Sequence, residues 1–229
     1  MDHVLYEMMD WAAVEEIVYS EAANPDLQLG PHLTERGLLI QAFIPNAAEI
    51  SVRLDTSQKV YPMDQEDEAG YFAVLIPRKT VADYTLLISY KDGVTEEIRD
   101  PYAFASQMKE RDLKKFEAGI HYDIYEKMGA HPTEINGVRG VYFAVWAPCA
   151  MRVSVVGDFN FWDGRRHMMR KLGDSGIFDL FIPGVEPGMI YKYEVKAQNG
   201  DNLLKADPYG NYSELRPANA SVIWDISQY

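Results

Sequence analysis

VVGDFNFWDGRRH, residues 155–167, places two large aromatic side chains and a Trp-Asp-Gly turn directly after a β-branched run. β-branched residues favour a strand, and the Asn, Asp and Gly that follow favour a turn. We therefore predict a strand that ends in a loop carrying Phe161 and Trp162. The flat face of an exposed indole can stack on the C–H face of a pyranose ring. The alternative is that Trp162 packs in the core or as a lid.

Outward from this stretch, short β-branched or aromatic runs end at Pro, Gly or Asp, which is typical of antiparallel sandwiches. The predicted strands cover residues 38–44, 49–54, 71–76, 84–90, 141–147, 152–156, 177–182, 190–197 and 221–225. Asp92-Gly93 and Asn199-Gly200 predict hairpin turns. Apolar residues at helical spacing after Asp10, a candidate N-cap, predict a helix near the start.

The chain repeats itself. FIPNA at residues 43–47 recurs as WAPCA at 146–150, and the triplet at 30–32 recurs loosely as Ala130-His131-Pro132. The offset grows from 103 residues at the first of these pairs to 107 at the later DPY motifs, residues 100–102 and 207–209. A steady drift of this kind indicates a duplicated domain that later took small loop insertions.

We therefore predict a mainly β protein with two tandem immunoglobulin-like antiparallel β-sandwiches, a short N-terminal helix and a helical linker. The first domain covers residues 1–117, including a linker helix within 104–116, and the second covers 118–229. Where the second copy has DFNFW at 158–162, the first has DTSQ at 55–58, without a ring. The first domain is accordingly interpreted as scaffold.

The formal charge of −13 lies mostly in the first half of the 229 residues. An acidic surface repels polyanions, which argues against nucleic acid and anionic membranes as partners and leaves a neutral polysaccharide open. No apolar run reaches the roughly 18 residues that span a bilayer. The single cysteine, Cys149, suits a reducing compartment, so a cytoplasmic location is expected. Arg165, Arg166, Arg170 and Lys171 form a basic cluster that is expected to pair with acidic groups of a neighbouring domain, or to be a solvated face.

We find no catalytic constellation in the sequence. The acidic residues Asp158, Asp163, Asp174 and Asp179 fall at turns and in a strand, where capping and solvation explain them. The five histidines show no metal-ligand spacing, and one cysteine cannot form a thiolate cage, so neither a metal nor a cofactor is predicted.

Five motifs occur in order: WAP (146–148), GDFNFWDGRRH (157–167), GIF (176–178), YKYE (191–194) and KADPY (205–209). This region resembles the family 48 carbohydrate-binding module of bacterial glycogen branching enzymes. Upstream, NPDLQLGPH (24–32) and LLIQAFIPNAAEISV (38–52) resemble the first N-terminal domain of the same enzymes. The resemblance covers nearly the whole chain.

The resemblance implies a non-catalytic region that binds or positions α-1,4-glucan, such as glycogen or malto-oligosaccharides, for a downstream (β/α)₈ domain. Enzymes of that family transfer an α-1,4-glucan chain to a 6-hydroxyl, which forms an α-1,6 branch. Trp162 would stack on sugar, and Lys192 and Asn160 would contact hydroxyl groups. Relatives that bind glucan carry a second tryptophan where this chain has Asp201-Asn202-Leu203-Leu204, which implies weak binding on one platform.

Three alternatives remain open. The domains could be purely structural and brace the catalytic barrel, which predicts an exposed apolar patch. The chain could be the N-terminal region of a debranching enzyme, since pullulanases share the module. A kinase-type regulatory β subunit fits less well, because such subunits lack the duplicated first sandwich.

Overall fold

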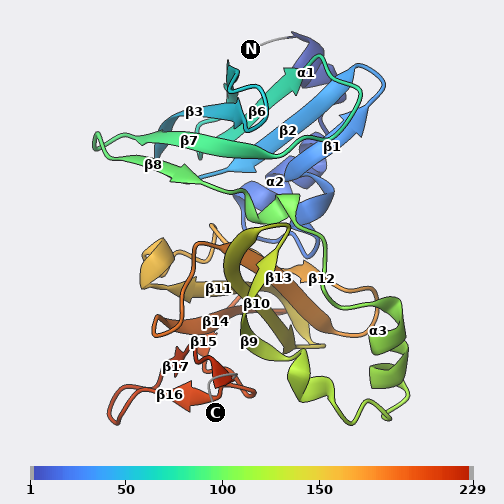
Figure 1. Cartoon of the computed structure of the whole chain (residues 1–229), viewed down its shortest axis with the longest axis vertical. Coiled ribbons are helices and arrows are strands. Elements are labelled where there is room, and N and C mark those ends of the chain that lie inside the picture. The colour runs from blue at the N-terminus through green and yellow to red at the C-terminus, as the bar shows by residue number, and fades with distance from the viewer. Residues whose placement is uncertain (1–2, 227–229) are drawn as a thin grey trace. The chain divides into compact units, whose positions relative to one another are not determined.

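The structure is a computed structural model that describes residues 3–226. The chain divides into two compact units, Met1–Ala103 and Phe104–Tyr229. Each unit contains two antiparallel sheets (Figure 1). The predicted mainly β fold, a tandem of sandwiches, is confirmed.

In the first unit, one sheet has the strand order β1-β2-β6-β5 and the other has the order β4-β3-β7-β8. Its elements are α1 (His3–Met8), α2 (Trp11–Val18), β1 (Gly30–Thr34), β2 (Gly37–Phe43), β3 (Ala47–Leu54), β4 (Val60–Pro62), β5 (Asp64–Asp67), β6 (Tyr71–Ile76), β7 (Tyr84–Tyr90) and β8 (Thr95–Ile98). The Asp10 side chain accepts a hydrogen bond from Ala13 N at 3.3 Å, so the predicted cap of α2 is confirmed. Helix α1 was not predicted.

In the second unit, the orders are β12-β13-β10-β9 and β11-β14-β17-β16, with β15 paired to β14. Its elements are α3 (Glu110–Glu117), β9 (Gly129–Ile135), β10 (Val138–Trp146), β11 (Ala150–Gly157), β12 (Arg170–Lys171), β13 (Ile177–Pro183), β14 (Ile190–Ala197), β15 (Asn202–Lys205), β16 (Tyr212–Ser213) and β17 (Ser221–Val222). The strand predicted for 221–225 is thus shorter than expected.

Period-2 alternation decides which side chains enter each core. In β14, Tyr191 and Tyr193 are buried, whereas Lys192 and Glu194, which alternate with them, face away from the core. In β7 the same alternation buries Tyr84, Leu86 and Ile88, which join a core drawn from both sheets of the first unit. Each unit therefore has a core of its own.

The duplication is visible in matching hydrogen bonds. Tyr84 donates its hydroxyl to Asp100 Oδ2 at 2.7 Å, and Tyr191 donates to Asp207 Oδ2 at 2.6 Å. Each aspartate also accepts a backbone N–H from the residue two positions later. The two copies thus preserve one buried Tyr–Asp pair in each sandwich.

The same comparison corrects one alignment of the repeat. His32 Nε2 lies 3.1 Å from Leu29 O, and His131 Nε2 lies 2.8 Å from Met128 O. His32 therefore corresponds to His131, and the triplet at residues 30–32 matches residues 129–131, one position earlier than the sequence alignment had it.

The division between the units falls at Ala103/Phe104, whereas the sequence placed the domain boundary between residues 117 and 118. Phe104 and Met108 are buried in a cluster with Tyr142 and Phe181 of the second unit, and Leu113 of α3 packs against it. The segment before α3 therefore packs with the second sandwich. Its apolar side chains cover a sheet face that would otherwise be open.

The buried Asp100 predicts a pH effect on stability. Burial raises the pKa of the Asp100 carboxyl to about 6, against the hydrogen bonds from Tyr84 and Tyr102, which lower it. Between the unfolded pKa of about 4 and this value, the folded state holds more protons, so unfolding free energy falls as pH rises. Through Asp100, the free energy of unfolding should fall by up to about 3 kcal/mol over this pH range, since each pKa unit corresponds to about 1.4 kcal/mol.

Asp100→Asn does not titrate and isolates this effect. Urea denaturation of both proteins from pH 4 to 7 should show the wild type losing stability relative to the variant, mostly between pH 4 and 6. A stability difference that stays constant over this range would contradict the prediction.

Candidate functional site

The aromatic loop follows β11 directly, as the sequence predicts. A single 3₁₀ turn, Asp158–Asn160, comes after the strand, and the next two residues, Phe161 and Trp162, have φ of 57° and 60°. Both lie in the left-handed region, which bulky residues rarely occupy. Phe161 is 82% exposed and Trp162 is partly exposed. The loop therefore presents two neighbouring rings at the end of the strand.

Asn160 holds this loop from inside. Its Nδ2 donates to Val155 O at 2.8 Å and lies 2.8 Å from His167 Nδ1, while its Oδ1 accepts from Gly157 N at 2.9 Å. Burial, together with the Arg166 charge, lowers the pKa of His167 to about 3, so the imidazole is neutral and Nδ1 can accept. Asn160 is 0% exposed and offers no free surface to a sugar. The structure thus places it as a positioning residue rather than at a hydroxyl contact.

Trp162 is fixed by its polar edge. The indole Nε1 donates to Asp158 Oδ1 at 2.8 Å, and its backbone N–H donates to Gly157 O at 3.0 Å. Asp158 therefore has a defined role in the loop, consistent with its interpretation as a turn residue. These two bonds orient the indole without enclosing it.

A buried ion pair anchors the far end of the loop to the sheet. Arg152 of β11 donates to Glu194 Oε1 of β14 at 2.6 Å, to Gly164 O at 3.1 Å and to Ser154 Oγ. A Cβ at Gly164 would lie 2.1 Å from Glu194 Oε1. Only glycine allows the loop backbone to approach β14 this closely. The loop therefore lies against the outward face of the sheet.

Lys192 lies on that same outward face. It pairs with Val156 in the β11–β14 register, and its Nζ donates to the side-chain oxygen of Asn219. Asn219 is exposed in the connection between β16 and β17. No local motif marked Asn219, because only the strand order of the sheet brings it to Lys192.

Two members of the basic cluster pair within the second unit. Arg165 binds Asp163 at 2.7 Å, and Arg170 is buried with its Nε 3.0 Å from Asp179 Oδ1. Arg170 is therefore part of the core of the unit, whereas Arg165 is exposed and pairing of the cluster with a neighbouring domain stays a prediction. Asp179 is buried in β13, consistent with a structural role.

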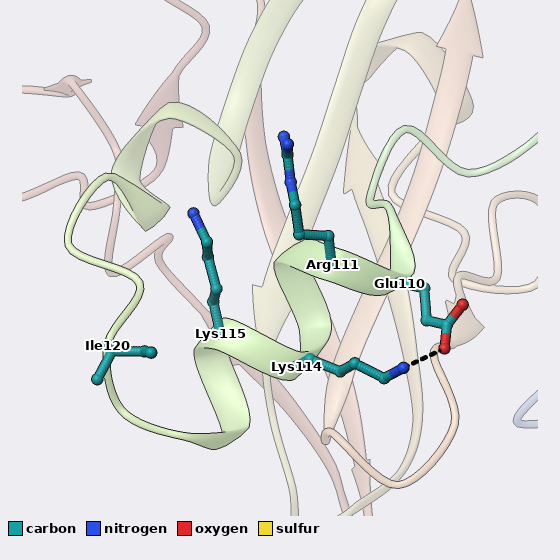
Figure 2. A pocket seen from close by; sticks show the side chains of 5 residues that line it. All are labelled: Glu110, Arg111, Lys114, Lys115 and Ile120. Carbon is teal, nitrogen blue, oxygen red and sulfur yellow. Dashed lines mark ion pairs between the residues drawn. The ribbon is translucent and has the colours of Figure 1, made fainter.

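An open pocket beside α3 is lined by Glu110, Arg111, Lys114, Lys115 and Ile120 (Figure 2). Lys114 Nζ lies 2.6 Å from Glu110 Oε1. This lining is charged and has no aromatic ring, so it lacks the stacking surface that a sugar site needs. Among residues 3–226, no three or more His, Cys, Asp or Glu side chains are placed to hold a metal ion. No helix in the described part of the chain is long and apolar enough to cross a membrane.

Two family models match the chain. Residues 10–102 match "alpha-1,4-glucan branching enzyme GlgB, N-terminal domain", and residues 127–210 match "Carbohydrate-binding module 48 (Isoamylase N-terminal domain)". The second match includes the aromatic loop and Lys192. Asn219 lies just beyond it.

Curated relatives agree with these matches. A protein of Trichodesmium erythraeum named 1,4-alpha-glucan branching enzyme GlgB is 45% identical over 94% of this chain and 28% of its own length. A protein of the same name from Rubrobacter xylanophilus is 41% identical over 95% of this chain and 30% of its own. The chain therefore spans less than a third of these relatives. Among solved structures, a pullulanase from Anoxybacillus sp. is 16% identical over 88% of this chain and 28% of its own, with a TM-score of 0.37.

Proposed function

Since the chain carries the N-terminal region of the 1,4-alpha-glucan branching enzymes GlgB, a GlgB N-terminal domain followed by a family 48 carbohydrate-binding module, we propose that it binds and positions α-1,4-glucan without performing catalysis. The observation that carries this proposal is that the exposed loop after β11 presents Trp162, and the adjacent strand β14 of the same sheet presents Lys192 with its partner Asn219. A ring and adjacent polar groups match the two surfaces of a sugar.

Each group has a distinct part in binding. The Trp162 ring would stack on the C–H face of a glucose unit, held at a fixed angle by its bond to Asp158. Lys192 would donate to hydroxyl oxygens, and Asn219, already its partner, would orient the ammonium group. Neither interaction needs a charged ligand, which agrees with the formal charge of −13. Asn160 and His167 would keep the loop in the binding conformation.

For the whole protein, we propose the transfer of α-1,4-glucan chains to form α-1,6 branches, with the chemistry in a catalytic domain of the same polypeptide. The names of the relatives and their greater length support this. This chain would hold a donor or acceptor glucan near that domain and raise its local concentration. A cytoplasmic location is part of the proposal, supported by the single cysteine, which is free and exposed.

A bracing role for the second unit is the competing proposal, and one observation favours it. Ile120, Tyr122, Tyr125 and Trp146 are large apolar side chains that are more than half exposed. Exposed apolar side chains suit contact with another domain. These residues are different from those of the aromatic loop, so bracing and glucan binding can be tested separately.

Trp162→Ala tests the binding proposal. Loss of the stacking ring should weaken maltoheptaose binding by roughly fivefold to tenfold, because a ring contributes on the order of 1 kcal/mol beyond its buried area. Titration of the whole chain, followed by chemical-shift changes, measures this. Circular dichroism would verify that the variant is folded.

Trp146→Ala is the matched control, because it also removes one exposed tryptophan ring. Trp146 is an exposed tryptophan of the same unit but lies on the other sheet, where its Nε1 donates to Ser175 O at 3.1 Å. This variant should bind maltoheptaose as the wild type does. If the wild-type chain shows no binding at millimolar sugar while folded, the glucan proposal is wrong and bracing remains.

A further inference from the structure

A second pair of rings lies on the face that carries Lys192. In the sheet register, Ile190 of β14 pairs with Val222 of β17, which in turn pairs with Tyr212 of β16. Directly paired residues of adjacent strands point to the same face, and Ile190 shares its face with Lys192, two positions further on. Tyr212 therefore points to the outward side of the sheet.

The Tyr212 ring is stacked on Trp224. The ring centroids are 4.8 Å apart and the planes are inclined by 29°. Tyr212 is 50% exposed, and Trp224 is partly exposed. Stacked rings that are not enclosed by a core leave a flat apolar surface facing water. The mutual stacking also limits the freedom of both side chains before any ligand arrives.

The loop that carries Trp162 follows the first strand of this sheet and Tyr212 lies on the last, with Lys192 on β14 between these two strands. Along the sheet the order is β11, β14, β17 and β16, and Trp162 follows β11 while Tyr212 lies on β16. Neighbouring strands lie about 4.8 Å apart, so β11 and β16, which are three strand spacings apart, are separated by about 14 Å. In strand order, the loop with Trp162 comes first, the strand of Lys192 second and the strand of Tyr212 last.

We infer that Tyr212 and Trp224 form a second stacking subsite for the same α-glucan chain, which crosses the sheet strands with Lys192 and Asn219 between the two platforms. This inference rests on the proposed function. A malto-oligosaccharide alternates C–H faces with hydroxyl edges along its length, and this surface offers matching groups in that order. A protein partner would not require the polar pair between the rings.

The consequence is a dependence on glucan length. A short oligosaccharide reaches one platform, whereas a longer one contacts both at once and gains affinity from the link between them. Tyr212→Ala should weaken maltoheptaose binding by roughly fivefold to tenfold, the value of one stacking contact, and leave maltotriose binding on Trp162 nearly unchanged. Tyr212→Phe keeps the ring and should bind both sugars as the wild type does.

The experiment is a titration of the whole chain with maltotriose and maltoheptaose, comparing the wild type, Tyr212→Ala, Tyr212→Phe and the control Tyr122→Ala. Tyr122 is 83% exposed and lies outside this sheet, so its loss should change neither affinity. If Tyr212→Ala unfolds, Trp224→Ala removes the other ring of the pair and is expected to give the same selective loss for maltoheptaose.

The outcomes separate the two proposals. If the wild type binds neither sugar, the glucan function itself fails. If the wild type binds and Tyr212→Ala keeps the full preference for maltoheptaose, the second subsite is overturned while the Trp162 site stands. Equal losses for both sugars would also overturn it, since a second platform affects only the longer chain.

Discussion

Asp179→Asn is expected to lower the free energy of unfolding by about 3–5 kcal/mol, the usual effect of removing one partner of a buried ion pair. Asp179 is 0% exposed in β13. Its Oδ1 lies 3.0 Å from Arg170 Nε, and its Oδ2 accepts the Tyr142 hydroxyl at 2.8 Å and the Ser106 hydroxyl. The amide would leave the Arg170 guanidinium buried without its countercharge.

The same carboxylate connects the segment before α3 to the sandwich, because Ser106 donates to it and Arg170 donates to Phe104 O at 2.8 Å. Asp179→Asn should therefore also increase protease cleavage near Ser106. Urea denaturation measures the stability loss. Asp174→Asn is the control, because Asp174 is an exposed turn residue, and its free energy of unfolding should stay within about 0.5 kcal/mol of the wild type. A loss below about 1 kcal/mol would show that the network is not needed.

Arg152→Met should destabilise the second unit by about 3 kcal/mol and release the aromatic loop. The substitution keeps most of the volume but removes the charge paired with Glu194 and the donor to Gly164 O. A largely buried carboxylate and a carbonyl then lose their partners, each at a substantial cost.

Two measurements separate the effects of Arg152→Met. Urea denaturation gives the stability loss, and hydrogen exchange at residues 158–166 reports on the loop at conditions where the unit stays folded. Arg139→Met is the control, because the Arg139–Glu134 pair at 3.5 Å is exposed and contributes little. Unchanged exchange in the loop would contradict the anchoring role of Arg152.

Strands were the most predictable part of this protein, because the residue pattern of a strand, such as alternation of apolar and polar residues, can be seen in consecutive residues. The predicted strand 84–90 and the start of 177–182 match β7 and β13 in residue numbers. The loop after β11 was also predictable, since turn residues follow a β-branched run there. Strands β2 and β13 are buried along nearly their whole length, on both faces, and a strand buried in this way does not show the alternation that predicts a half-exposed strand.

The roles of polar residues were harder to predict, because they depend on partners far away in the sequence. Asparagine is a residue type common in exposed turns, but the Asn160 side chain is buried and makes three hydrogen bonds within the loop. Arg170 belongs to a basic run, but its partner Asp179 lies on the adjacent strand β13. Asn219 and Lys192 meet only once β14 and the β16–β17 connection are placed together.

The left-handed backbone at Phe161 and Trp162 has a kinetic consequence. Two successive bulky residues at positive φ are unfavourable in an unfolded chain, so the folded unit enforces this geometry before any glucan is present. A platform that is already formed needs no ordering step on association. In the function proposed above, a modest affinity would then give short residence times and rapid exchange. A glucan chain bound at this surface would dissociate and rebind quickly without any rearrangement of the loop.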